Sequence, residues 1–143
     1  MNLLIKIVDF FYQKRKYSFL NKTINKNVNI LIDVGAHHGD TINEFLSIFS
    51  IKKIYAFEPS KKNFDKLKKE VKKINKKKFV EIAIYPFGLG KKNDVLVLNE
   101  ITDGVSNTFN NLNINSKYFK KKKLILTLFG IKKFINERVP TKI

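Results

Sequence analysis

Two acidic residues and two glycines in the first half of the chain have types and spacing suited to ligand binding. Asp33 stands two residues before Gly35, Gly39 follows, and Glu58 comes later, directly before a proline. Glycine lacks a Cβ, so the backbone at Gly35 and Gly39 can turn tightly and approach a ligand closely. A carboxylate such as Glu58 can accept two hydrogen bonds from a ribose diol. Asp33 would meet a cation better than a phosphate.

A strand–helix–strand pattern is expected to position these residues. The apolar run Ile30–Ile32 predicts a short parallel strand buried on both faces. Residues 42–49 carry apolar side chains at helical spacing, and Asp40 or Thr41 is expected to cap that helix. Ile54–Phe57 predicts a second buried strand. This strand–glycine turn–helix–strand–acid unit is the opening half of a nucleotide-type Rossmann fold, in which the helix N-terminus faces the ligand crevice.

The glycine turn favours one class of nucleotide ligand over another. A dinucleotide fingerprint reads Gly-x-Gly-x-x-Gly, so that a pyrophosphate can lie against bare backbone. Here His37 stands where the second glycine would be. S-adenosylmethionine offers an ammonium group, a sulfonium and a ribose without a phosphate, and it suits a turn that begins with an acid. A nicotinamide-dependent Rossmann enzyme is the alternative that this turn disfavours.

The motif Ile-Asp-Val-Gly-Ala-His-His-Gly-Asp-Thr followed by Tyr-Ala-Phe-Glu-Pro resembles the class I S-adenosylmethionine-dependent methyltransferases, and the FkbM-type family most of all. The resemblance covers Ile30–Pro59 strongly. It continues more weakly through Pro86–Gly90 and Asp103–Asn107 to the segment Val139–Thr141. Family members continue beyond a Val-Pro-Thr-like segment, so the resemblance implies a chain that is truncated at its C-terminus.

The resemblance implies methyl transfer from S-adenosylmethionine, most often to an oxygen of a small-molecule or saccharide-type acceptor. It places Asp33, Gly35 and Gly39 around the amino acid part of the cofactor and Glu58 on its ribose. The loop after the third strand is expected near the adenine. The expected cofactor-binding residues are therefore Asp33, Gly35, Ala36, His37, Gly39, Glu58, Pro59, Phe87 and Gly88. No catalytic residue is assigned from the sequence.

The remaining elements complete an α/β prediction with helices on both faces of a mainly parallel sheet. Residues 1–28 are expected to form an amphipathic helix, from about Asn2 to Lys16, and a polar loop over Asn21–Asn29. The helix is interpreted as docking on the sheet, with an interfacial membrane anchor or a cover over the substrate entrance as the alternative. Residues 29–143 are expected to form one Rossmann-like domain, incomplete at its C-terminus.

Within that domain the sequence predicts a helix capped by Ser60 that runs to about Asn75, with its lysines on a solvated face. Phe79–Ile84 and Val95–Leu98 are expected strands. The run Leu124–Phe129 fits a strand or a short helix. A final edge strand is expected over Arg138–Ile143, where Pro140 is allowed only at an edge or bulge.

The basic composition of the chain bears on whether it binds nucleic acid or another anionic partner. The formal net charge is +17, and all basic residues except Arg15 and Arg138 are lysine. Arginine is favoured for reading base edges, so no specific nucleic-acid partner is expected, and the charge is interpreted as composition bias. A non-catalytic fragment or a basic module for nucleic acid or an anionic surface is the alternative. No oligomeric state is predicted.

The sequence also gives no sign of a disulfide, a metal site or a membrane-spanning segment. The chain has no cysteine, which excludes disulfides and thiolate metal sites. No apolar run is long enough to span a bilayer and no cleavable signal is recognised, so a cytoplasmic location is expected. His37 and His38 are neighbours whose side chains are expected to diverge, and no third histidine exists, so no metal site is predicted.

Overall fold

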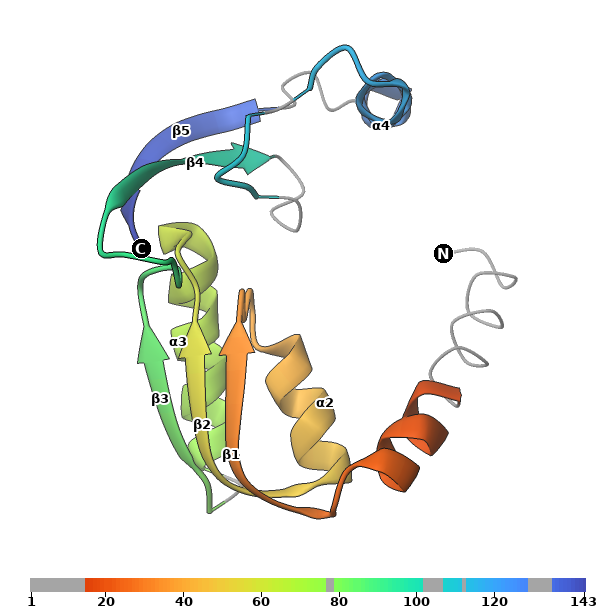
Figure 1. Ribbon diagram of the computed structural model, residues 1–143, viewed down its shortest axis with the longest axis vertical. Coiled ribbons are helices and arrows are strands. Elements are labelled where there is room, and N and C mark those ends of the chain that lie inside the picture. The colour runs from red at the N-terminus through yellow and green to blue at the C-terminus, as the bar shows by residue number, and fades with distance from the viewer. Residues whose placement is uncertain (1–14, 77–78, 102–106, 112, 129–134) are drawn as a thin grey trace.

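The computed structural model describes residues 15–76, 79–101, 107–111, 113–128 and 135–143. A parallel sheet and its helices come first, and a separate antiparallel ribbon follows (Figure 1). No helix in this described part of the chain is long and apolar enough to cross a bilayer. Most of the predicted N-terminal helix lies outside the described residues.

Three strands form the parallel sheet in the order β1-β2-β3: β1 (Asn27–Val34), β2 (Ser50–Phe57) and β3 (Glu81–Tyr85). Helix α2 (Asp40–Ile48) joins β1 to β2, and α3 (Lys61–Asn75) joins β2 to β3. The register pairs Asp33 with Ala56 and Phe57 with Tyr85, so the three carboxyl ends lie together. This confirms the α/β class and the Rossmann-like strand–helix–strand unit.

The core of this unit is one cluster between the sheet and its helices. Ile42 of α2, Ile54 and Ala56 of β2, and Leu67 of α3 are fully buried within it. The 3.6-residue period of α3 places Leu67, Val71 and Ile74 on the inner face, as the sequence predicts. Ser60 caps α3, because its Oγ accepts a hydrogen bond from the Asn63 backbone N–H.

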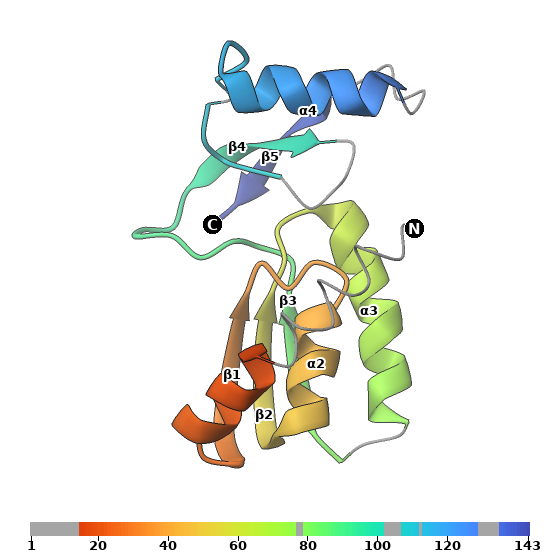
Figure 2. The ribbon, with the colours of Figure 1, turned by 90° about the vertical axis from the view of Figure 1, so that its right-hand side faces the viewer.

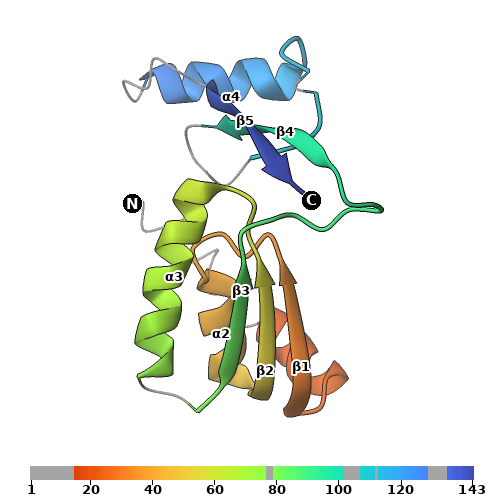
Figure 3. The same ribbon diagram turned by 90° about the vertical axis from the view of Figure 1, so that its left-hand side faces the viewer.

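For the part of the chain that the structure describes, the prediction of helices on both faces of the sheet is wrong. Both α2 and α3 lie on one side of the three strands (Figures 2 and 3). Successive parallel strands that are joined by right-handed crossovers and lie side by side in one direction place their helices on the same face. Ile30, Ile32 and Val34 on the other face of β1 are 56%, 60% and 61% exposed, so β1 is not buried on both faces.

The start of the described chain also differs from the prediction. Residues 15–23 are helical, so the polar loop begins later than Asn21, and β1 begins before Asn29. Lys16 in this helical segment forms an ion pair with Glu44 of α2, and Leu20 packs against the core cluster. The segment is therefore attached to the parallel unit, although its polar sequence carries little sign of helix.

The antiparallel ribbon consists of β4 (Val95–Ile101) and β5 (Ile135–Lys142). Both strands are longer than predicted, and Pro140 lies opposite Val97 in this two-stranded ribbon, where an edge position is available. Helix α4 (Lys117–Leu128) precedes β5 and decides the ambiguous apolar run in favour of helix. Its side chains Leu124 and Leu128 are 62% and 77% exposed.

Candidate functional site

The glycine turn folds because backbone donors at its start meet the end of β2. The N–H groups of Gly35 and Ala36 both donate to the carbonyl oxygen of Phe57, at 2.8 and 3.0 Å. Gly35, His37 and Gly39 have φ values of 84°, 49° and 93°, in the left-handed region that favours glycine. The turn is therefore held to the sheet at the carboxyl end of β1 and β2.

The two glycines of the turn face different surroundings. A Cβ at Gly35 would have no heavy atom within 4 Å, so this edge of the turn opens on free space. A Cβ at Gly39 would lie 3.2 Å from Cδ1 of Leu67, so this glycine permits close packing on α3. Gly39 is also the N-cap of α2 without a side-chain cap, so the predicted cap at Asp40 or Thr41 is wrong. Asp40 is instead the first helical residue, where its charge favours the positive end of the helix dipole.

Glu58 ties the ends of the elements together. Its side chain is 5% exposed; Oε2 accepts from the His37 N–H at 2.8 Å and Oε1 from the Ser60 N–H at 2.9 Å. Its own backbone N–H donates to the carbonyl oxygen of Tyr85 at 3.0 Å. The carboxylate thus joins the glycine turn to the start of α3, and the backbone N–H of the same residue joins both to the tip of β3.

The carboxyl group of Asp33 interacts electrostatically with the carboxylate of Glu58. Burial raises the pKa of the Asp33 carboxyl above its usual range, and the negative charge of Glu58 raises it further. The Oδ2 atom of Asp33 is buried and has no hydrogen-bond partner among the described residues. A cation beside these two carboxylates would offset both effects.

The two histidines of the turn stack on one another, so the expectation that they diverge is wrong. Their ring centroids are 3.6 Å apart with 24° between planes, because the left-handed backbone at His37 turns the two side chains together. Burial lowers the pKa of His37, and the neighbouring His38 lowers it further. His37 Nε2 is buried without a partner in the described part of the chain, whereas His38 Nε2 lies 3.2 Å from Oδ1 of Asn63.

The side chains of His37, His38 and Asp40 have ligand atoms within 4.8 Å of one another, which is close enough for them to share a metal ion. A metal is bound along the lone pairs in the plane of each imidazole. Rings stacked at 24° direct those lone pairs side by side rather than at one point. The observed rotamers therefore do not present a converging ligand set, and the absence of a metal site stays a prediction.

A cavity of about 300 Å³ lies at the carboxyl end of β1 and β2. Five of the residues expected to bind the cofactor lie in its wall, together with residues from α3, β4 and the segment after β4. The wall consists of Val34, Gly35, His37, Glu58, Pro59, Asn63, Gly88, Leu89, Leu98, Asn107 and Phe109. The five are Gly35, His37, Glu58, Pro59 and Gly88. Asp33, Ala36 and Gly39 are not in the wall.

A second cavity of about 580 Å³ adjoins the first and shares Gly88 and Leu89 with it. Phe87 lines this second cavity, and its ring also contacts those of Phe57 and Tyr85, with centroids 5.7 and 5.5 Å away. The loop after β3 therefore separates the two hollows.

Sequence reasoning missed several wall residues. Asn63, Leu98 and Phe109 come from elements whose packing on the cavity has no local signal. Asn107 had a signal, because it ends the segment Asp103–Asn107 in which the family resemblance continues. The other residues of that segment fall outside the described residues.

No protein-family model matches the chain, and a search of curated proteins gives no significant match. Among solved structures the chain is similar to the crystal structure of the methyltransferase FkbM from Methylobacillus flagellatus KT, with a TM-score of 0.49 and 17% identity. The similarity covers 56% of this chain and 23% of that one, and it concerns the fold alone.

Proposed function

We propose that the protein binds S-adenosylmethionine in the cavity of about 300 Å³ and transfers its methyl group to an oxygen of a small-molecule or saccharide-type acceptor. One observation carries the proposal: the open edge of Gly35 and the buried carboxylate of Glu58 line one cavity, with the Asp33 carboxyl nearby. The motif Ile30–Pro59 and its family resemblance support the same ligand.

Glu58 has the acceptor capacity that a ribose needs. An ionised carboxylate offers about four lone-pair sites, and each oxygen of Glu58 uses one on a backbone N–H. The remaining sites suit the two hydroxyls of a ribose. Because the same carboxylate is fixed by two backbone donors, its orientation is set before a ligand arrives, which lowers the entropy cost of binding.

Asp33 and His37 suit a ligand that carries positive charge. Among the described residues Oδ2 of Asp33 has no partner, so an ammonium group would supply one, and its positive charge would lower the raised pKa of the Asp33 carboxyl. The lowered pKa of His37 keeps its imidazole uncharged near neutral pH, so the ring adds no positive charge beside a cationic donor. A pyrophosphate, in contrast, would meet two carboxylates.

When bound, the cofactor would supply an activated methyl group for in-line transfer. The contribution of this chain is positioning: Gly35 allows close approach of the backbone, Glu58 orients the ribose, and Leu98 and Phe109 exclude water from the cavity wall. The hydrogen bond from Ser60 Oγ to Glu100 Oε1, at 2.6 Å, holds the ribbon that bears Leu98 against the start of α3.

The experiment is calorimetric titration of the full chain with S-adenosylmethionine, S-adenosylhomocysteine and NADH. We expect both adenosyl ligands to bind and NADH to bind far more weakly. Glu58→Gln is expected to lose at least tenfold in affinity, because hydrogen bonds to a charged group contribute about 1.5–3 kcal/mol. Glu81→Gln is the matched control, since Glu81 lies at the other end of β3 in an exposed ion pair with Lys53.

Circular dichroism of both variants separates a lost ligand contact from lost folding. Tighter binding of NADH, or equal affinity of the folded Glu58→Gln variant and the parent, would contradict the proposal. Transfer of a labelled methyl group to free saccharides then tests the enzymatic step separately from the binding step.

A further inference from the structure

Helix α3 presents a continuous lysine face on the side opposite its buried residues. Its eight exposed lysines, counting the C-cap, are Lys61, Lys62, Lys66, Lys68, Lys69, Lys72, Lys73 and Lys76. At 100° per residue they fall within an arc of about 160°, along about 22 Å of helix. The apolar residues Leu67, Val71 and Ile74 occupy the other side and belong to the core.

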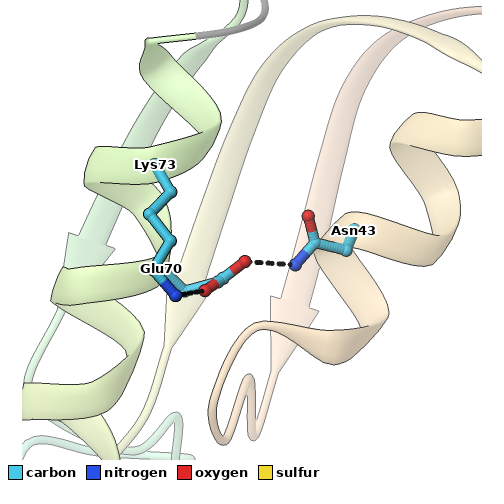
Figure 4. A network of polar contacts seen from close by, with 3 residues as sticks. All are labelled: Asn43, Glu70 and Lys73. Carbon is cyan, nitrogen blue, oxygen red and sulfur yellow. Dashed lines mark hydrogen bonds and ion pairs between the residues drawn. The ribbon is translucent and has the colours of Figure 1, made fainter.

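Little of this charge is neutralised within the fold. Residues 61–76 hold eight lysines and two carboxylates, a net charge of +6. Asp65 forms an ion pair with Lys68 at 3.0 Å, and Glu70 forms one with Lys73 at 2.8 Å while also accepting from Asn43 (Figure 4). Among the described residues the other six lysines form no ion pair, so the face keeps a dense positive charge.

The chemistry of the face favours a fluid anionic surface over a nucleic acid. Lysine ammonium groups are point charges that do not read bases or grip phosphates in a bidentate way. Phe64, the one aromatic residue of α3, is half-buried against the core beneath Lys68, so α3 offers no exposed ring on which a base could stack. Mobile lipid headgroups can gather around separate point charges on a helix, and four to eight lysines on one helix are typical of such binding.

We propose that the lysine face of α3 docks the protein on membranes that contain anionic lipids such as phosphatidylserine. The apolar side of α3 is committed to the core, so the contact is electrostatic and the helix does not insert into the bilayer. Binding of this kind weakens steeply with salt, because the Debye length falls from about 10 Å at 0.1 M to about 3 Å at 1 M. The proposal is independent of the methyl-donor site.

The test is sedimentation of the full chain with vesicles of phosphatidylcholine, with and without phosphatidylserine. The first variant replaces Lys61, Lys62, Lys69 and Lys72 by glutamine, which removes four charges that form no ion pair with described residues and keeps a good helix former. The control variant replaces Lys117, Lys120, Lys121 and Lys123 of α4 by glutamine, which removes the same charge from another exposed helix. Circular dichroism establishes that both remain folded.

We expect binding only to vesicles with phosphatidylserine, and loss of that binding at high salt. Each lysine near an anionic leaflet is worth about a fivefold factor, so the loss of four should lower the partitioning of the α3 variant by roughly several hundredfold, while the α4 variant should partition nearly as the parent does. The proposal is overturned by the absence of lipid-dependent binding or by equal loss in the two variants. It is also overturned if generic RNA binds more tightly than these vesicles and loses its affinity in the α3 variant.

Discussion

The parallel unit of residues 27–85 and the ribbon with α4, residues 95–142, use their apolar side chains differently. In the parallel unit, nine buried residues form one cluster between the sheet and its two helices. In the ribbon, Leu98 and Ile101 are buried, while Val95 and Val97 are 57% and 50% exposed. The first unit therefore has a core of its own, and the second depends on contacts at its boundary.

The candidate cavity lies where these two units meet. Gly35 and Glu58 come from the parallel unit, and Leu98 and Phe109 come from the ribbon side. Segments with few buried apolar contacts open locally at lower free energy than the core. One wall of the cavity therefore belongs to the unit that has its own core, and the opposite wall is linked to it by contacts that include the hydrogen bond from Ser60 to Glu100.

The largest expected difference between the units is in the free energy of unfolding. Leu67→Ala removes a fully buried side chain from the cluster and should cost about 2–5 kcal/mol. Leu124→Ala, the same change in α4 at a side chain that is 62% exposed, should cost less than about 0.5 kcal/mol. Urea unfolding followed by circular dichroism measures both, and similar losses would show that α4 is packed as firmly as α3.

Within the parallel unit, Gly35 and Gly39 are expected to differ in how a substitution affects stability and donor binding. Gly39→Ala combines a left-handed backbone with a Cβ 3.2 Å from Leu67, and it should cost about 2–3 kcal/mol. Gly35→Ala meets only the backbone cost of about 1–2 kcal/mol, but its methyl group projects beside the cavity and should weaken binding of the donor. Thermal unfolding and calorimetry separate the effects. Equal loss of donor affinity in both variants would contradict this division of roles.

The N-terminal caps of α3 and α4 allow a second comparison of how much each unit contributes to the free energy of unfolding. Ser60→Ala removes both the cap of α3 and the link to Glu100, and it should destabilise the protein by about 1–2 kcal/mol. Ser116 caps α4 by accepting from the Phe119 N–H at 3.1 Å. Ser116→Ala should leave global unfolding in urea nearly unchanged, because α4 adds little to the core. A larger loss from Ser116→Ala would reverse the proposed order of the units.

The smallest predicted effect is the pH dependence that Asp33 contributes. Its folded-state pKa lies above the ordinary 3.8, so the folded chain holds this proton more tightly than the unfolded chain does. Stability from this group is present below 3.8 and is lost as the pH rises through the raised pKa. Asp33→Asn should therefore raise the melting temperature of the ligand-free chain at about pH 7, with a smaller gain at about pH 4.

The same substitution should weaken binding of the donor, because the uncharged amide of asparagine would not attract an ammonium group. Thermal unfolding with and without S-adenosylmethionine measures the two opposite effects in one series. A lower melting temperature of the ligand-free variant at neutral pH would contradict the role assigned to Asp33.

Local periodicity made the parallel unit predictable. Leu67, Val71 and Ile74 repeat at helical spacing, and the runs at residues 30–32 and 54–57 are short and apolar, so β1, α2, β2 and α3 follow from the sequence. The exposed face at Ile30 and Ile32 did not follow. A continuous apolar run has no alternation to reveal that one face is uncovered, and the placement of helices depends on the order of all the strands.

The candidate site was predictable only where its residues carry their own chemistry. Glu58 and Gly35 stand out through residue type and spacing within one motif. Leu98 and Phe109 reach the same cavity from the ribbon side, and an ordinary apolar residue has no local mark of such a contact. The stacking of His37 on His38 was hidden too, because it depends on a left-handed φ at a residue that is not glycine.

Mapping of backbone amide shifts by NMR during titration with S-adenosylmethionine tests the central claim most directly. We expect perturbation of Gly35, His37, Glu58 and Gly88, together with Leu98 and Phe109 across the cavity, and little change in α4. Shifts confined to α4, or no shifts at these positions at ligand saturation, would contradict a methyl-donor site at the end of β1 and β2.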